Sequence, residues 1–403
     1  MSFKTVIFLA AALAFTACSF SSRTGIRRST PERQGMSSAH LALIDSTVNA
    51  SIRNGDIPGA VVGVVRNGNL VYEKAFGNKA VYPETEPMTV ETLFDLASVS
   101  KCVGTTLSVM QMVEQGKLRL VDSVAFYIPG FRPWVDPQTG EKVTITVQHL
   151  LTHSSGLEAY LDDVNAYLRE FGPGTPDSLM NVISTRIRRC FRPGTQQLYS
   201  CLNFITLQHI VETITGERLC DYAQEHVFDA LGLQHTSYFP EDTLLCAPTV
   251  RQPDGSVLRG KVHDPIARLI NQGNSGNAGV FSNVEDLAVI CAALLADGSY
   301  NGRRILSPLT VNRMFAVPPA NDPQVARALG WDCYYPEPYT CGDVFSVTNV
   351  RGHTGFTGTS LILDPDTNTA VIILAHRVHP QIQGSTSRLR STVASIAAAS
   401  IGR

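Results

Sequence analysis

The sequence predicts an α/β (α+β) fold in which one antiparallel sheet is built from both ends of the chain. Strand patterns occur early, at 60–66 and 70–76, and return late, at 359–363 and 370–375. Between them lies a long stretch of helix and loop patterns. Because strands at both ends of a chain form one core when they share a sheet, we expect flanking helices and a large, mostly helical inserted region.

A helix and a hairpin open the predicted domain. Residues 38–53 repeat apolar side chains at helical spacing, which predicts a helix with one face on the sheet. The two N-terminal strands are joined by Asn67-Gly68-Asn69, and this composition favours a tight turn. We therefore expect an antiparallel β-hairpin at the start of the sheet.

The middle of the chain is predicted to be mostly helix and loop, with breaks at glycine and proline. We expect a single domain over 31–403, with a sheet part at about 31–97 and 328–403 and a helical part at about 98–327. The cleft between the two parts is the natural place for a site. The predicted helices are 103–118, 146–151, 198–215, 219–231, 286–295 and 385–399.

The composition is that of a globular protein without a nucleic-acid partner. The 403 residues are 44% hydrophobic and 17% charged, which is enough to bury a large core. Lysine and arginine number 33 against 35 acidic residues, so the net charge is -2. No long basic run provides the positive surface that phosphate backbones require.

The N-terminus has the pattern of an export signal. Lys4 precedes the apolar run 6–15, which is too short to span a bilayer. Ala17 directly before Cys18 resembles the lipobox of bacterial lipoproteins, so we expect a signal peptide over 1–17, lipidation of Cys18 and a linker over 18–30. The protein is then an exported periplasmic or cell-surface lipoprotein, attached to the membrane by the lipid on Cys18. The alternative is plain cleavage and secretion as a soluble protein.

Eight cysteines remain when Cys18 is set aside. An exported protein can form disulfides, and Cys333 and Cys341, which flank a loop rich in tyrosine and proline, are the best candidates for a pair. That loop, residues 334–339, either lines a lipophilic acyl or acceptor site or packs on the surface. No cysteine and histidine group has zinc spacing, so we predict no metal and no cofactor.

Chemistry is suggested first by Ser98 and Lys101, at the start of the helical pattern after the apolar residues 94–97. One helical turn places the Lys101 amine beside the Ser98 hydroxyl. A serine becomes nucleophilic when a base takes its proton, and burial lowers the pKa of a lysine so that it can be that base. In the alternative, Ser98 caps the helix and Lys101 is a solvated residue of its first turn.

Two further sites strengthen the catalytic interpretation. Tyr199 lies near the start of a predicted helix, and a phenol beside a lysine can relay a proton to a leaving group. His353, Thr354 and Gly355 stand just before a predicted strand, and Phe356 follows. Backbone N–H groups at such a glycine-rich edge can stabilise an oxyanion together with that of Ser98. The alternatives are a core tyrosine and a tight glycine turn with a surface histidine.

In this order, the three sites resemble the serine β-lactamase and penicillin-binding protein superfamily. The likeness is greatest to its class C β-lactamase-like branch, which includes family VIII carboxylesterases, D-aminopeptidases, DD-carboxypeptidase-like proteins and acyltransferases such as the lovastatin enzyme. It runs from about Pro31 to the last helix, so the resemblance implies a β-lactamase/transpeptidase-like fold. The blocks that carry it are LFDLASVSK from Leu93, ITVQHLLTHSSGL from Ile145, NAGVFSNVEDLA from Asn277 and GHTGFTGTSLILDP from Gly352.

The resemblance implies a role for each site residue. Ser98 would be the acylated nucleophile, Lys101 its base and Tyr199 the proton relay. The backbone N–H groups of Ser98 and Phe356 would hold the oxyanion. Substrate-binding positions would be His353, Thr354, Gly355, Cys201 and Asn203.

The chain departs from the family pattern at two of these positions. Many relatives have lysine where His353 stands, and histidine is mostly neutral near pH 7. Relatives that cleave amides usually have asparagine where Cys201 stands, and a thiol cannot replace both faces of an amide. Asn203 lies two positions later. Both departures favour esters over β-lactams and peptides. His263 and Asp264 either shape the cleft or form an internal pair.

The sequence therefore predicts an exported serine acyl-enzyme hydrolase or acyltransferase. Its partners would be a small ester or acyl donor and water or an alcohol as acceptor. Within the same fold, the alternatives are a D-alanyl carboxypeptidase, a D-aminopeptidase or a weak β-lactamase. A relative that binds its ligand without turnover is an alternative of another class.

Overall fold

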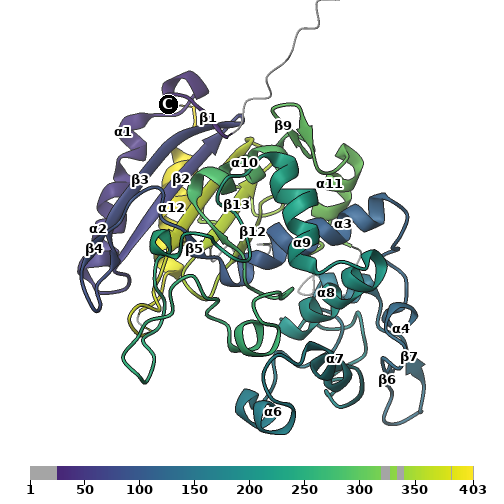
Figure 1. The fold of residues 1–403 in the computed structure, drawn as a ribbon. Coiled ribbons are helices and arrows are strands. Elements are labelled where there is room, and N and C mark those ends of the chain that lie inside the picture. Colours follow the sequence, from purple (N-terminus) through teal and green to yellow (C-terminus); the bar gives the residue numbers. More distant parts are fainter. Residues whose placement is uncertain (1–24, 319–326, 334–339, 383, 403) are drawn as a thin grey trace, which may run out of the picture.

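The computed structural model describes residues 25–318, 327–333, 340–382 and 384–402. The predicted export signal, Cys18 and the tyrosine-rich loop 334–339 lie outside the described residues. Figure 1 shows a sheet, with strands from both ends of the chain, beside a mostly helical region. Among the described residues, no helix is both long and apolar enough to cross a bilayer.

One sheet, antiparallel except for the β1–β3 pair, confirms the predicted joining of the two ends of the chain. Its strand order is β1-β3-β2-β14-β13-β12-β11, and β4 pairs with β3 at the side. The late strand β14 pairs directly with β2, with Ile372 opposite Gly63. The strand bounds are β1 Arg27–Arg28, β2 Gly59–Arg66, β3 Asn69–Ala80, β4 Glu86–Pro87, β11 Asp332–Cys333, β12 Arg351–Thr354, β13 Ser360–Asp364 and β14 Thr369–Ala375.

The sheet begins earlier in the chain than the sequence indicated. Arg27–Arg28, in the segment predicted as a linker, form β1 and pair in parallel with β3. Side chains alternate between the two faces of β2, so that Val62 and Val64 belong to one buried cluster and Val61 and Val65 to the other. The sheet therefore separates two hydrophobic cores.

Terminal helices cover one face of the sheet. The predicted helix 38–53 is divided into α1 (Ser38–Leu41) and α2 (Leu43–Arg53), and the last helix is α12 (Ser387–Ala399). Their apolar side chains form one buried cluster with Val62 and Val64. Of the two arginines in α12, Arg388 is exposed and Arg390 is buried.

The other face is covered by α10 (Val284–Leu295), which contacts β2 and β14. Gly63 allows this close approach, because a Cβ there would clash with the Val284 side chain. The sequence assigned this helix to the helical part of the domain. In space it belongs to the layer that packs on the sheet.

Most of the remaining helices lie in the inserted region, and three short strand pairs, β5-β8, β6-β7 and β9-β10, lie outside the main sheet among the described residues. The helix predicted at 103–118 begins earlier, as a π-helix over Lys101–Thr106, and continues as α3 (Leu107–Glu114). The other elements are η1 Glu32–Gln34, β5 Phe94–Asp95, η2 Ala97–Val99, α4 Val124–Tyr127, β6 Trp134–Val135, β7 Lys142–Val143, α5 Val147–Leu151, α6 Val164–Phe171, α7 Pro176–Thr185, α8 Cys201–Thr215, α9 Leu219–Ala223, η4 Gln224–Asp229, η5 Thr243–Leu245, η6 Ile266–Ile270, β8 Phe281–Ser282, β9 Ser299–Tyr300, β10 Arg303–Arg304 and α11 Pro308–Phe315.

The predicted disulfide between Cys333 and Cys341 is wrong, since both thiols are free. Cys333 packs against the core on the α10 side of the sheet, whereas Cys341 is buried in the cluster on the α2 and α12 side. Opposite faces of a sheet keep the two sulfur atoms apart.

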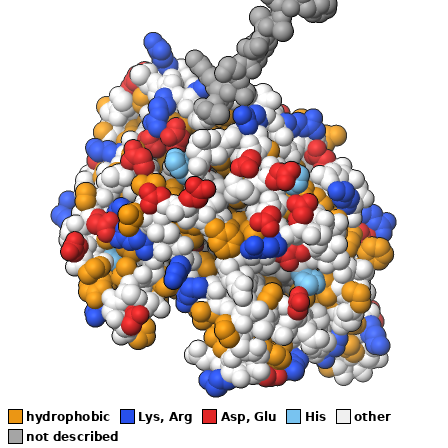
Figure 2. Space-filling model, viewed as in Figure 1, with side chains coloured by type: hydrophobic (Ala, Val, Ile, Leu, Met, Phe, Trp, Pro, Cys, Tyr) orange, Lys and Arg blue, Asp and Glu red, His pale blue; other side chains and the backbone are white. Residues whose placement is uncertain are grey.

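Charge is mixed over the face drawn in Figure 2, where acidic and basic side chains are interspersed. This distribution agrees with the small net charge of the sequence. The visible surface offers no broad field of one sign that would attract a polyanion.

Candidate active site

Ser98 lies in a strained turn between β5 and the π-helix. Ala97 has a φ of 47°, in the left-handed region that L-residues rarely adopt. The buried Asp95 carboxylate holds the turn by accepting hydrogen bonds from Ala97 N–H (2.8 Å) and His263 N–H (2.6 Å). Burial raises the pKa of Asp95 to about 6, although the two hydrogen bonds act in the opposite direction and lower it. Ser98 is the only partly exposed residue of the segment 92–100.

Lys101 is fully buried beneath Ser98. Its Nζ donates to Ser98 Oγ (3.0 Å), to the Asn277 carbonyl (2.8 Å) and to Cys201 Sγ (3.6 Å). Three acceptors match the three N–H bonds of an ammonium group.

The sequence predicted a lowered pKa for Lys101, and this prediction is wrong. Burial does disfavour the charge, but Cys201 and Tyr199 stabilise the ammonium and the pKa of Lys101 is raised. The resting site therefore holds a proton on Lys101. Acylation requires that this proton leave the cluster first.

Tyr199 is the third residue of the cluster with Ser98 and Lys101. Its ring centroid is 5.0 Å from Lys101 Nζ, 4.4 Å from the His153 ring and 5.9 Å from the His353 ring. The residue is 38% exposed and, with Ser98, lines a cavity of about 540 Å³. Burial of the phenol group raises the pKa of Tyr199, and the nearby Lys101 charge opposes that rise. The phenol is therefore protonated at neutral pH.

The backbone N–H groups of Ser98 and Phe356, two residues that line the cavity, have no hydrogen-bond acceptor among the described residues. Phe356 belongs to the turn between β12 and β13. A Cβ on Gly355 would lie 2.5 Å from the Leu96 carbonyl, so glycine allows this turn to approach the nucleophile segment. Thr357 and Thr359 secure it by donating to the Asp95 and Leu96 carbonyls.

The predicted residues His353, Thr354 and Gly355 all line the cavity. His353 is 1% exposed, and burial lowers its pKa to about 4. Its Nδ1 lies 2.9 Å from the Thr354 carbonyl. The position therefore carries no charge near pH 7, as the sequence suggested.

The other two predicted substrate-binding residues do not line the cavity. Cys201 contacts Lys101 instead. Asn203 is fully buried, where its Oδ1 accepts from Ser155 Oγ (2.6 Å) and its Nδ2 lies 3.1 Å from His153 Nδ1. The structure thus places Asn203 in the support of the site, and its prediction as a substrate ligand is not met by this geometry.

The sequence did not indicate several residues that line the cavity, nor the Asn277 carbonyl that accepts a hydrogen bond from Lys101. Arg327 and Asp332 form a buried ion pair at the cavity, and Arg377 lies near the Phe356 ring. His263 stacks on the same ring, with centroids 5.7 Å apart. No sequence pattern marks Arg327 or Asp332, whereas Asn277 opens one of the blocks that carry the family resemblance.

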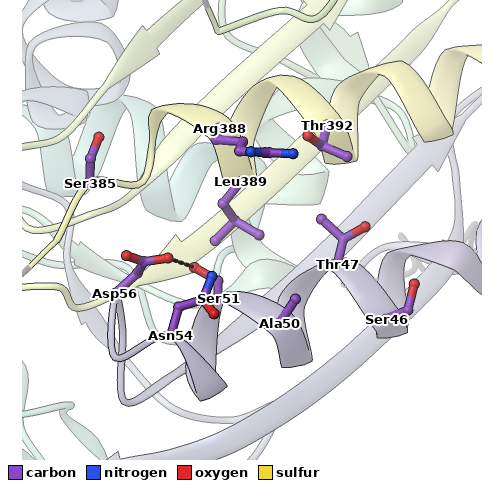
Figure 3. Close-up of a pocket in the computed structure, with 10 residues that line it drawn as sticks. All are labelled: Ser46, Thr47, Ala50, Ser51, Asn54, Asp56, Ser385, Arg388, Leu389 and Thr392. Atoms are coloured by element: carbon purple, nitrogen blue, oxygen red, sulfur yellow. Dashed lines mark hydrogen bonds between the residues drawn. The ribbon is translucent and has the colours of Figure 1, made fainter.

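A second cavity of about 430 Å³ lies between α2 and α12 (Figure 3). Its lining is mostly polar, and Ser51 Oγ donates to Asp56 (3.1 Å) within it. Ser385 lines both cavities, but Ser98, Lys101 and Tyr199 are absent from this one. The catalytic candidates therefore gather at the first cavity.

A candidate metal group among the described residues lies outside both cavities. Glu217, Glu225 and His226 have ligand atoms within 4.8 Å of one another. Both glutamates are exposed, and exposed acidic groups commonly cluster without an ion. The group has no place in the chemistry of Ser98.

Comparison with known proteins identifies the family. The Beta-lactamase family model matches residues 44–394, most of the chain. The chain belongs to this beta-lactamase family. Among curated proteins, the chain is similar to the N-acetylmuramyl-L-alanine amidase of Bacillus subtilis (strain 168), 30% identical over 87% of this chain and 84% of that protein. The putative D-alanyl-D-alanine carboxypeptidase of Escherichia coli (strain K12) is 27% identical over 94% and 92%.

Solved structures agree on the β-lactamase fold. EstCE1, described as a hydrolase with promiscuous acyltransferase activity, has a TM-score of 0.70 and 24% identity, with 89% of this chain and 99% of that chain covered. A LovD6 mutant of simvastatin synthase from Aspergillus terreus has a TM-score of 0.68 and 21% identity, with 91% and 98% covered. The chain is thus a serine hydrolase of the beta-lactamase family, with the fold of these structures.

Proposed function

We propose that this beta-lactamase family enzyme opens ester substrates through an acyl intermediate on Ser98 and passes the acyl group to water or an alcohol. The observation that supports this most directly is the hydrogen bond between Lys101 Nζ and Ser98 Oγ at the cavity that Tyr199 also lines. A buried base beside an accessible hydroxyl is the arrangement that nucleophilic catalysis requires.

In the acylation step, Ser98 Oγ gives its proton to a deprotonated Lys101 and forms a bond to the carbonyl carbon. The carbonyl oxygen becomes an oxyanion, which the N–H groups of Ser98 and Phe356 stabilise. The bond to the leaving alcohol then breaks, and Tyr199 gives the alkoxide a proton. Lys101 returns a proton to the phenolate, so Lys101 and Tyr199 are back in their starting states and the proton of Ser98 has left with the alcohol.

Deacylation reverses these steps with a new hydroxyl group. Water or an alcohol gives its proton to the cluster, attacks the acyl carbon, and Ser98 Oγ leaves with a proton from Lys101. Hydrolysis and transfer use the same residues, and the cavity decides between them by how well it holds an acceptor hydroxyl.

Esters are favoured over amides because the cavity has no side-chain amide in its lining among the described residues. Cys201 faces Lys101, and Asn203 is committed to Ser155 and His153. A substrate amide would leave its N–H and carbonyl without such a partner. An ester needs fewer of these contacts.

Cell-wall chemistry is the second candidate, because the curated relatives are named as a muramyl amidase and putative D-alanyl-D-alanine carboxypeptidases. In that reaction the same Ser98 acyl-enzyme would form from a peptide. The leaving amine would need the Tyr199 proton even more than an alkoxide does.

A substrate panel separates the two candidates. Purified enzyme is given a series of alkyl esters and, separately, muropeptides that end in D-alanyl-D-alanine, with Ser98→Ala as the control for each. We expect ester cleavage that depends on Ser98. Its kcat/KM should exceed that for D-alanine release by about tenfold or more, which is the size of the effect of one contact in a binding pocket. Faster D-alanine release would replace the ester proposal by the carboxypeptidase one.

We further propose that the enzyme is exported and held to the membrane by a lipid on Cys18. The proposal is based on the apolar run 6–15 and on Ala17 before Cys18. Cys18→Ala is expected to move the protein from the membrane fraction to the soluble fraction. Retention of that variant in the membrane fraction would exclude the anchor.

A further inference from the structure

The backbone on both sides of Tyr199 is tied to one residue, His153. Leu198 N–H donates to the His153 carbonyl (2.9 Å), and Ser200 N–H donates to His153 Nδ1 (3.0 Å). These bonds keep residues 198–200 out of the helix, so α8 begins at Cys201 and not at Leu198 as the sequence predicted. Both neighbours of Tyr199 thus have their N–H groups fixed by the same histidine.

The His153 ring also contacts the side chain of Tyr199. The centroids of the His153 and Tyr199 rings are 4.4 Å apart, and the Phe204 ring centroid lies 5.2 Å from that of His153. His153 itself is fully buried, with a φ of 55°. Its backbone conformation, two hydrogen bonds and two ring contacts leave the tyrosine little freedom to shift.

The hydrogen bonds define the protonation state of His153. Nδ1 lies near two donors, Ser200 N–H and Asn203 Nδ2 (3.1 Å), so Nδ1 is an acceptor and the ring proton is on Nε2. Burial, together with the charges of Arg327 and Lys101, places the pKa of His153 well below its ordinary value. The ring therefore stays neutral and does not carry protons for the reaction.

We propose that His153 is the positioning residue of Tyr199, which fixes the phenol where it can give its proton to the leaving group. The inference rests on the proposed role of Tyr199 as proton relay. His153 acts through Tyr199 and does not touch the substrate. If it is lost, the nucleophile Ser98 and its lysine remain in place, but the relay is displaced.

The test compares two esters of the same acyl group. An alkyl ester needs a proton on its leaving alkoxide, whereas a p-nitrophenyl ester does not, because p-nitrophenolate is a stable anion. His153→Phe keeps a ring between Tyr199 and Phe204 but removes the acceptor for Ser200 N–H. His153→Asn retains an acceptor oxygen, and asparagine tolerates a left-handed φ.

We expect His153→Phe to lower kcat for the alkyl ester by about tenfold or more, with KM and the p-nitrophenyl rate changed by less than about threefold. His153→Asn should retain most of the alkyl ester rate. Tyr199→Phe should show the same leaving-group pattern, and adding His153→Phe to it should cost little more, since both act through one phenol. His149→Asn, which alters a helix cap in the same segment, should not distinguish the esters.

Equal losses on both esters, or losses that add in full to those of Tyr199→Phe, would overturn the inference. If His153→Phe does not fold, His153→Asn still tests the proposal, because it retains an acceptor for Ser200 N–H. A selective loss of the alkyl ester rate in His153→Asn as large as that in Tyr199→Phe would show that this acceptor does not position the phenol. A Tyr199→Phe enzyme without leaving-group dependence would instead refute the proposed role of Tyr199. Absence of any acyl-enzyme on Ser98 would refute the proposed function as a whole.

Discussion

At the scale of single residues, the proton on Lys101 determines when the site is active. Its Nζ has three acceptors and a raised pKa, and the phenol of Tyr199 has a raised pKa as well. The resting cluster is therefore protonated at neutral pH. Only the fraction that has lost a proton can accept the proton of Ser98.

The first prediction concerns pH. For an uncharged ester, kcat/KM should rise steadily with pH between about 6 and 9, because this parameter reports the ionisation of the free enzyme. The measurement is initial rates at subsaturating substrate, with Ser98→Ala to subtract spontaneous hydrolysis. A plateau that begins near pH 6 would mean that Lys101 is already neutral there.

The second prediction concerns Asp95, which accepts two backbone hydrogen bonds in a fully buried position. Asp95→Asn leaves either Ala97 N–H or His263 N–H facing an amide donor, so the free energy of unfolding should fall by about 1–3 kcal/mol. Urea unfolding measures the change.

Asp254 provides the matched control for Asp95. It also accepts two hydrogen bonds, from Ser256 N–H and Ser256 Oγ, but in an exposed loop. Asp254→Asn should change the free energy of unfolding by less than about 0.5 kcal/mol. Similar losses in the two variants would contradict the role given to the buried carboxylate.

At the scale of elements, the oxyanion site depends on how closely the turn after β12 approaches the segment before Ser98. Gly355 lacks a side chain at the contact with Leu96, and Arg390 donates to the carbonyls of Gly355 and Thr359 from α12. The N–H of Phe356 is thereby held at the cavity by two elements from the C-terminal part of the chain.

The third prediction is that Gly355→Ala lowers the acylation rate by about tenfold to a hundredfold, because the new methyl group displaces the turn and with it one oxyanion donor. Pre-steady-state kinetics with an activated ester measures this rate. Gly140→Ala serves as the control: its φ of 73° makes alanine strained there, but the methyl group enters open space at an exposed turn that does not line the cavity, so the acylation rate should not change. An unchanged acylation rate in Gly355→Ala would remove Phe356 from the account.

At the scale of the whole molecule, the fold was predictable from the positions of its strands. Short apolar runs rich in valine and isoleucine near both ends of the chain indicated the shared sheet, and β14 beside β2 confirms it. What the sequence did not indicate is the side on which α10 packs, because a helix that is apolar all round beyond Glu285 and Asp286 suits any buried position. Short elements such as β1 and β12 also lack enough residues for a period.

The candidate site was predictable where motifs are local and not where contacts are distant. Ser98 and Tyr199 do line one cavity, and Lys101 lies buried beside both of them. The raised pKa of Lys101 could not be anticipated, since it depends on Cys201, a hundred residues away in the chain. Likewise, the burial of Asn203 follows from its contacts with Ser155 and His153, which no spacing reveals.

The fourth prediction concerns the cysteines. Because Cys333 and Cys341 pack in different cores, both should be alkylated when the protein is unfolded without reductant. Peptide mass mapping of the alkylated protein measures this. A linked peptide pair, lighter by two hydrogens, would show that the chain passes through the sheet differently.

The most direct test of the whole account is intact-protein mass spectrometry of the mature chain, seconds after mixing with a short-chain activated ester. We expect a transient mass increase equal to one acyl group, located on Ser98 by peptide mapping and absent from Ser98→Ala. An added alcohol that shortens its lifetime would identify a transferase. Turnover without any adduct, or an adduct that persists in Ser98→Ala, would contradict catalysis through Ser98.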